Sequence, residues 1–182
     1  TYNPVIYELS KENKELIPKT IKHIFIISDR RERIETLRKI AKAVNSDKTM
    51  IFINTKYDLE ESLQKLQYHN YNVAALAGNI DKQSKKKAVE DFQNGRLQYL
   101  LATDVAARGL QIDHVSTVIN VNLPEEPTEY LHRAGRCGRN NEQGLCISII
   151  TENELNKIKK YQKAFNINIV QKRLYNGKIV SK

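Results

Sequence analysis

Three arginines and a histidine lie close together in the eight-residue segment 132–139, which also holds two glycines. Arginine is permanently charged, and its planar guanidinium donates hydrogen bonds in a fork that matches phosphate oxygens. The glycines let the backbone bend and bring these side chains together. Because like charges this dense repel one another, the segment predicts a polyanionic ligand, and a nucleoside triphosphate is the simplest candidate. A solvated basic loop that binds nothing is the alternative.

The rest of the sequence lacks the other parts of a nucleotide site. It has no G-x-x-x-x-G-K-[ST] phosphate-binding loop and no Asp-Glu-Ala-Asp quartet to hold magnesium. The arginines can stabilise a terminal phosphate, but the remaining phosphates and the metal need another domain. We therefore expect arginine fingers that act on a nucleotide bound elsewhere. The sequence starts at Thr1 without a Met, which favours a piece of a longer protein.

Length and composition predict one soluble domain with a nucleic-acid partner. The chain has 182 residues, of which 40% are hydrophobic, and a net charge of +9. No apolar run approaches the eighteen or so residues of a membrane span, and no signal peptide is present, so we expect no membrane partner. Cys137 and Cys146 form neither a zinc pattern nor a disulfide framework. We expect no metal site, a monomer and a reducing, cytoplasmic location.

Apolar, β-branched runs alternate with amphipathic segments along the chain. Such continuous strands between helices predict an α/β fold: a doubly wound, mainly parallel sheet with helices on both faces, in which ligands bind beyond the carboxyl ends of the strands. We expect the domain to cover residues 21–182, with 1–20 as an N-terminal arm or interdomain linker and 171–182 as peripheral. The expected strands are 21–27, 49–53, 73–76, 99–103, 117–121 and 145–150, and the expected helices begin near Asp29, Thr55 or Asp58, Asp81, Pro127 and Thr151.

Three stretches resemble motifs of one enzyme family. Met50 to Thr55 resembles its motif IV, Leu101 to Leu110 its motif V and Tyr130 to Arg139 its motif VI. In these motifs the chain is similar to the C-terminal RecA-like domain of DEAD-box ATP-dependent RNA helicases. The resemblance implies ATP and RNA as ligands, with Mg²⁺ held by an N-terminal RecA-like domain absent from this chain. It also implies unwinding of short RNA duplexes by closure of the two domains, and a chain that is inactive alone.

The resemblance implies roles in ATP hydrolysis for residues of motifs V and VI. Arg136 and Arg139 match arginine fingers that reach the γ-phosphate. His132 matches a residue that contacts the other domain and couples closure to catalysis. Arg133 is expected at the interdomain contact, with anchoring of its own loop as the alternative. The ATP-binding residues implied in this chain are Gly109, Gln111, Arg136 and Arg139.

The resemblance also implies contacts with the RNA backbone at several strand ends. Threonine hydroxyls and free backbone N–H groups suit phosphate oxygens. Thr55 has helix capping as its alternative role, and Asp104 is better suited to holding an arginine than to meeting phosphate. The implied RNA-binding residues are Asn54, Thr55, Gly78, Lys85, Thr103 and Asp104.

The chain departs from the family pattern at several positions. Gln111 stands where the family usually has an Asp that hydrogen-bonds the ATP ribose, which affects nucleotide affinity. Lys85 replaces an arginine, and Cys137 replaces a threonine. Ala77 and Asn79 replace the His and Asp of a His-Gly-Asp sequence. Two other functions remain open: a DNA helicase or translocase of the same superfamily, and a non-catalytic module that docks a protein.

Overall fold

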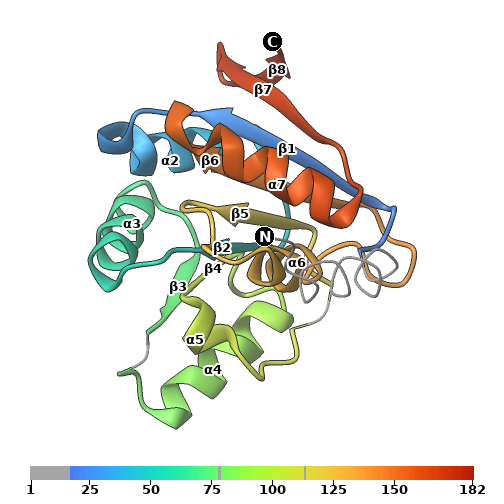
Figure 1. Cartoon of the computed structure of the whole chain (residues 1–182). Helices are drawn as coiled ribbons and strands as arrows, with labels where there is room; N and C mark the ends of the chain where they lie inside the picture. Colours follow the sequence, from blue (N-terminus) through green and yellow to red (C-terminus); the bar gives the residue numbers. More distant parts are fainter. Residues whose placement is uncertain (1–16, 78, 113) are drawn as a thin grey trace.

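A sheet of eight strands forms the centre of the protein (Figure 1). This computed structural model describes residues 17–77, 79–112 and 114–182. The strand order is β3-β4-β2-β5-β6-β1-β7-β8, and every neighbouring pair is parallel except β7 with β8. The expected mainly parallel sheet is therefore confirmed. The strands are β1 (Ile21–Ile27), β2 (Thr49–Phe52), β3 (Val73–Leu76), β4 (Tyr99–Ala102), β5 (Thr117–Asn120), β6 (Gly144–Ile150), β7 (Ile169–Tyr175) and β8 (Lys178–Ser181).

Helices cover both faces of the sheet, as the doubly wound fold requires (Figure 1). The helices α2 (Arg33–Val44) and α3 (Lys56–Tyr68) pack on one face. The opposite face carries α4 (Lys82–Gln93), α5 (Asp104–Ala107), α6 (Pro127–Ala134) and α7 (Leu155–Phe165). Each face has its own apolar core, because the strands are buried on both sides. Over the described residues, no helix is long and apolar enough to span a membrane.

The helix starts follow from short polar side chains at the ends of strands. The Thr55 hydroxyl accepts from the backbone N–H of Asp58 at the start of α3, and the Asp81 carboxylate caps α4. Thr151 and Glu154 form the predicted capping box. The prediction for Asp29 was wrong in detail. Its side chain makes no cap hydrogen bond, and a short 3₁₀ turn, η1 (Arg30–Glu32), separates it from α2; a second, η2 (Glu152–Glu154), precedes α7.

The last twelve residues are part of the sheet and not a peripheral segment. The strand β7 pairs with β1, and β8 returns beside it as an antiparallel hairpin. Apart from the buried Ile169, the residues of these strands are exposed or half-buried, so they lack the continuous apolar pattern of the inner strands. At the other end of the chain, residues 1–16 lie outside the described part. Ile17 is 7% exposed and joins the core.

The parallel topology brings the ends of several strands to one edge of the sheet. Asn54 and Thr55 follow β2, Thr103 follows β4 and Asn122 follows β5. Because β4, β2 and β5 are neighbours in the sheet, these polar residues lie side by side at its carboxyl edge. This is the position where ligands bind in doubly wound folds.

Gly138 fixes the arginine-rich segment against the start of β1. Its φ is +66°, and a Cβ built on it would lie 2.5 Å from Cγ1 of Ile21. Its carbonyl accepts a hydrogen bond from the Thr20 hydroxyl at 2.9 Å. Glycine is required here both by the left-handed backbone and by the close approach of the neighbouring strand.

We therefore expect Gly138→Ala to destabilise the domain more than Gly177→Ala, which serves as the control. Gly177 also has a positive φ, +71°, but among the described residues beyond its chain neighbours no atom lies within 4 Å of the position that an alanine methyl would occupy there. Gly177→Ala should lower the free energy of unfolding by about 1–2 kcal/mol, because alanine is strained in the left-handed backbone. Gly138→Ala adds steric overlap of about 1–3 kcal/mol. Urea unfolding of both variants measures the difference, and equal losses would contradict the proposed close packing.

Candidate active site

A buried arginine organises the carboxyl edge of the sheet. Arg133, on α6, is 1% exposed, and its guanidinium is surrounded by acceptors. Its Nε and Nη2 donate to the two carboxylate oxygens of Asp104, at 2.7 and 2.6 Å. Nη1 donates to the carbonyl of Asn122 at 2.8 Å and to Oδ1 of Asn120 at 3.3 Å, and Nη2 also donates to Oδ1 of Asn54 at 2.8 Å. One side chain thus joins the ends of β2, β4 and β5.

These contacts decide between the expected roles of Arg133. Because the guanidinium is buried within the domain, it is not placed for contact with another domain, and the interdomain prediction for Arg133 was wrong. The alternative, anchoring of its own loop, is what the contacts show. The prediction that Asp104 holds an arginine is confirmed by the bidentate ion pair.

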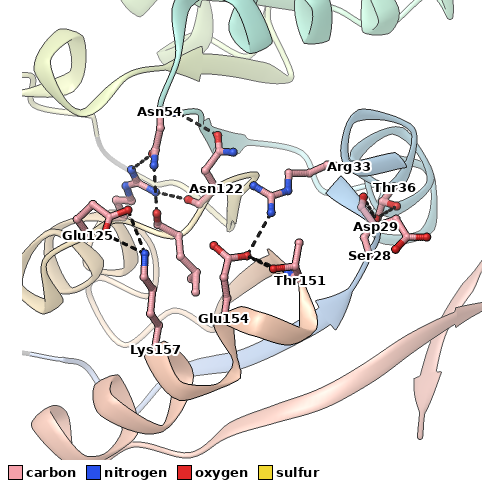
Figure 2. Close-up of polar contacts among 12 residues, drawn as sticks. Ser28, Asp29, Arg33, Thr36, Asn54, Asn122, Glu125, Thr151, Glu154 and Lys157 are labelled. Carbon is pink, nitrogen blue, oxygen red and sulfur yellow. Dashed lines mark hydrogen bonds and ion pairs between the residues drawn. The ribbon is translucent and has the colours of Figure 1, made fainter. Parts of the chain in front are cut away.

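Asn54 is occupied by the same network. Its Oδ1 accepts from Arg133, and its Nδ2 donates to the carbonyl of Leu123 at 3.1 Å. Its backbone N–H donates to Oδ1 of Asn122 at 3.0 Å, which Figure 2 shows as a direct contact between the two asparagines. The structure thus gives Asn54 a positioning role at the end of β2, and its expected contact with RNA stays a prediction.

Sequence reasoning missed two partners of Arg133, Asn120 and Asn122, and identified a third, Phe52, only as a core residue. Asn120 is fully buried at the end of β5, and it donates to Ser148 on β6 at 3.1 Å. The signal was present, because a polar residue inside an apolar strand needs a buried partner. Phe52 is 2% exposed, as expected for the core, and the Arg133 guanidinium also lies over its ring at 5.1 Å.

Arg136 and Arg139 are presented differently from Arg133. Arg136 is half-buried, and its guanidinium donates to the carbonyls of Leu110 and Ala107. Burial, and then the charge of Arg139, lower the pKa of Arg136 from its usual value. Arg139 is exposed, and its Nε donates to the Gly135 carbonyl at 3.0 Å. Two cations are therefore held near each other with part of their donor capacity unused, which suits an anion.

The residues expected to contact ATP lie around these arginines. Gly109, with φ +75°, and the exposed Gln111 stand on either side of the Leu110 carbonyl that Arg136 binds. Gly109, His132 and Arg136 line one small hollow. The His132 side chain is 67% exposed, with its Nδ1 3.9 Å from a Glu129 carboxylate oxygen. His132 is therefore accessible to a second domain, whereas Arg133 is not.

Two threonines expected to bind RNA cap helices, α3 and α5, at neighbouring strand ends. The hydroxyl oxygen of Thr55 accepts from Asp58 N at 3.1 Å, and that of Thr103 accepts from Ala106 N at 3.3 Å. The capping role of Thr55 is thus confirmed. A hydroxyl oxygen that accepts a hydrogen bond still carries its own proton. Capping is therefore compatible with donation to a phosphate oxygen.

The lysine run on α4 separates into paired and unpaired side chains. Lys86 and Lys87 each form an ion pair one helical turn along, with Glu90 at 3.9 Å and Asp91 at 2.8 Å. Lys85 has no carboxylate partner among the described residues, so its charge is available to a ligand. Gly78, another expected RNA contact, lies outside the described residues.

Comparison with known proteins identifies the family. Residues 32–141 match the family described as "Helicase conserved C-terminal domain". The chain belongs to this helicase family. It is 34% identical over 169 residues to the DEAD-box ATP-dependent RNA helicase CshC of Bacillus cereus, covering 93% of this chain and 42% of CshC. It is 32% identical to the probable ATP-dependent RNA helicase YfmL of Bacillus subtilis, covering 89% of this chain and 43% of YfmL. The helicase domain thus spans under half the length of these curated relatives.

Among solved structures, the chain is similar to the C-terminal domain of DEAD-box proteins. The C-terminal domain of the DEAD-box protein Dbp5 superposes with a TM-score of 0.80 at 29% identity, over 85% of this chain and 91% of that domain. Saccharomyces cerevisiae Dbp5 bound to RNA and ADP BeF3 gives 0.82 at 26% identity, over 95% of this chain and 49% of Dbp5. The resemblance to a DEAD-box C-terminal RecA-like domain is therefore confirmed. Dbp5 has also been solved bound to Gle1 and IP6, so a monomeric state stays a prediction.

The buried arginine generates a stability prediction for the helicase domain. Arg133→Ala leaves the Asp104 carboxylate and three other acceptors without their shared donor. Loss of one partner of a buried ion pair costs about 3–5 kcal/mol. Arg133→Lys should recover only part of this, because an ammonium lacks the planar fork.

Arg139→Ala is the matched control, since it removes an exposed arginine of the same motif and should change stability by about 0.5 kcal/mol or less. Urea unfolding of the 182-residue chain compares the three variants. A loss below about 1 kcal/mol for Arg133→Ala would show that the network does not hold the strand ends together.

Proposed function

We propose that this chain is the C-terminal half of an ATP-dependent RNA helicase, and that it completes an ATPase site on a preceding RecA-like domain. The observation that carries the proposal is the pair Arg136 and Arg139, of which Arg136 is held against the carbonyl of Leu110, between Gly109 and Gln111, and Arg139 is exposed. The sequence supplies cations for a terminal phosphate but no phosphate loop. Such a division suits a site shared between two domains.

The two arginines fit a phosphate for electrostatic reasons. Their mutual repulsion in the free domain is relieved when an anion binds between them. Charge that shifts during phosphoryl transfer is then met by donors already in place. Because the Arg136 guanidinium is tied to the carbonyls of Ala107 and Leu110, movement of the motif V turn is transmitted to this finger. His132, exposed beside them, is proposed as the contact that couples domain closure to hydrolysis.

The ribose side of the nucleotide is proposed to lie near Gly109 and Gln111. Gly109 adopts a positive φ, and in the part of the chain that the structure describes, beyond its two neighbours, nothing lies within 4 Å of the position that a Cβ would occupy, so a ligand can approach the backbone there. Gln111 is exposed, and its carbonyl accepts from Gln93 at 2.9 Å, which fixes its backbone. A neutral glutamine can hydrogen-bond a ribose hydroxyl, but less strongly than the carboxylate usual in the family. Mg²⁺ is proposed to bind the other domain.

RNA is proposed to cross the ends of β2, β4 and β3. Thr55 and Thr103 offer hydroxyl protons, and Lys85 offers an unpaired charge on the helix that follows β3. Asn54 and Asp104 support this surface through Arg133, and Gly78 is proposed as a backbone donor. Contacts of this kind bind phosphate and sugar without reading bases. We also propose that closure of the two domains opens short RNA duplexes. The proposed location of the protein is the cytoplasm.

The test is steady-state ATP hydrolysis by the full-length protein with saturating RNA. Arg136→Ala or Arg139→Ala should lower kcat on the order of 10³-fold, because an arginine finger acts mainly on the transition state. Binding of ATP should weaken less. Arg136→Lys should not restore turnover, since a point charge lacks the fork.

Lys42→Ala serves as the charge control, because Lys42 is exposed on α2, which packs on the opposite face of the sheet from α6. Its turnover should match the wild type. If both alanine variants of the motif keep near-normal kcat, the segment is only a basic loop and the proposal is wrong.

A further inference from the structure

Nearly all of the net positive charge of the chain comes from its last 28 residues. Residues 155–182 contain eight of the 30 basic residues and none of the 21 acidic residues. They therefore carry +8 of the net charge of +9, and the preceding 154 residues carry +1. This segment comprises α7 and the β7–β8 hairpin, and it contains none of the residues of the candidate active site.

The hairpin has one covered and one open face. Leu174 and Ile179, paired across the two strands, pack against the core on the α2 side. Side chains alternate along a strand, so Arg173, Tyr175 and Lys178 point to the opposite side. All three are exposed. In Figure 1 the hairpin, drawn in red, projects at the edge of the sheet outside β1.

An aromatic ring lies within this basic face. Tyr175 is 57% exposed, and the Arg173 guanidinium lies over its ring at 5.4 Å. Tyr175 pairs with Lys178 across the hairpin, and Lys182 donates to Gln171 at 3.4 Å on the same face. An exposed ring among cations is the combination that binds single-stranded nucleic acid, because the ring stacks on a base while the cations follow the backbone.

Exposed lysines of α7 extend the charge on the same side of the sheet. Lys159, Lys160 and Lys163 are exposed and have no carboxylate partner among the described residues. Lys157 differs, because it is paired with Glu125 at 3.0 Å, as Figure 2 shows. At the carboxyl end of β1, Arg173 and Leu174 line a hollow together with Asp29, Glu32 and Lys39.

This surface is separate from the proposed RNA site at the strand ends. In the sheet, β7 lies five positions from β4, which at about 4.8 Å per strand is roughly 24 Å. The two surfaces lie toward opposite edges of the sheet, so one does not extend the other by direct contact. A strand of RNA that reaches both must be longer than one that fills either.

We infer that the open face of the β7–β8 hairpin, with the exposed lysines of α7, is a second binding surface for single-stranded RNA. Arg173, Lys178 and Lys182 contact backbone phosphates, and Tyr175 stacks on one base. The inference rests on the proposed RNA-binding function. It adds a surface that holds RNA while the strand-end site opens and closes.

The test is titration of labelled oligouridine into the chain at several salt concentrations. A length of about 20 nucleotides can occupy both surfaces, since single sites of this kind hold about 4–16. Removal of three cations by Arg173→Ala, Lys178→Ala and Lys182→Ala should weaken binding and make the slope of log K against log salt shallower by about 2. Tyr175→Ala should weaken binding about fivefold and Tyr175→Phe should not, because the ring and not the hydroxyl stacks.

The matched control removes the same charge elsewhere, with Lys19, Lys22 and Lys42 changed to Ala, all of which are exposed. Equal losses in the two triple variants would overturn the inference, since only general charge attraction would remain. Lys85→Ala separates this inference from the proposed function. If Lys85→Ala weakens binding and the hairpin variants do not, the strand-end site stands and the second surface is wrong. If only the hairpin variants weaken binding, the second surface stands and the strand-end site is wrong.

Discussion

The arrangement of the site depends on one buried charge. Arg133 is enclosed by Asp104, Asn54, Asn120 and the Asn122 carbonyl, so every strand end that carries a candidate functional residue except that of β3 is tied to it. A buried guanidinium is costly unless its donors are satisfied. The cost makes the arrangement specific, because a shift of α6 or of any of these strand ends would leave a charge or an amide without a partner. The relative positions of these strand ends follow from this constraint.

The same segment places three arginines in three environments. Arg133 is internal, Arg136 is half-buried against backbone carbonyls, and Arg139 is exposed. A helix end explains the difference, since α6 stops at Ala134 and the chain then turns through Gly135 and Gly138. Position 133 faces the sheet, whereas Arg136 and Arg139 lie beyond the end of α6, where Arg136 is half-buried and Arg139 is exposed. A motif of like charges thereby separates into an anchor and two side chains available to a ligand.

Much of this fold could be predicted because its inner strands are buried on both faces and read as apolar runs. The capping box at Thr151 and Glu154 could also be predicted, because a cap is an interaction between residues close in sequence. The hairpin at 169–181 could not, since an edge hairpin with an open face lacks a continuous apolar pattern. At the site, the proposed finger roles of Arg136 and Arg139 follow from residue types and motif resemblance. The burial of Arg133 could not be predicted from the sequence, because its partners come from the ends of three strands, up to 79 positions away along the chain.

We propose that this domain supplies arginines to a nucleotide bound on a preceding RecA-like domain. RNA-stimulated ATP turnover measures it most directly, with the chain alone, the preceding domain alone and the two joined in one polypeptide. We expect turnover only for the joined protein, because this chain has the proposed fingers but no phosphate loop. Robust hydrolysis by the isolated chain would contradict it.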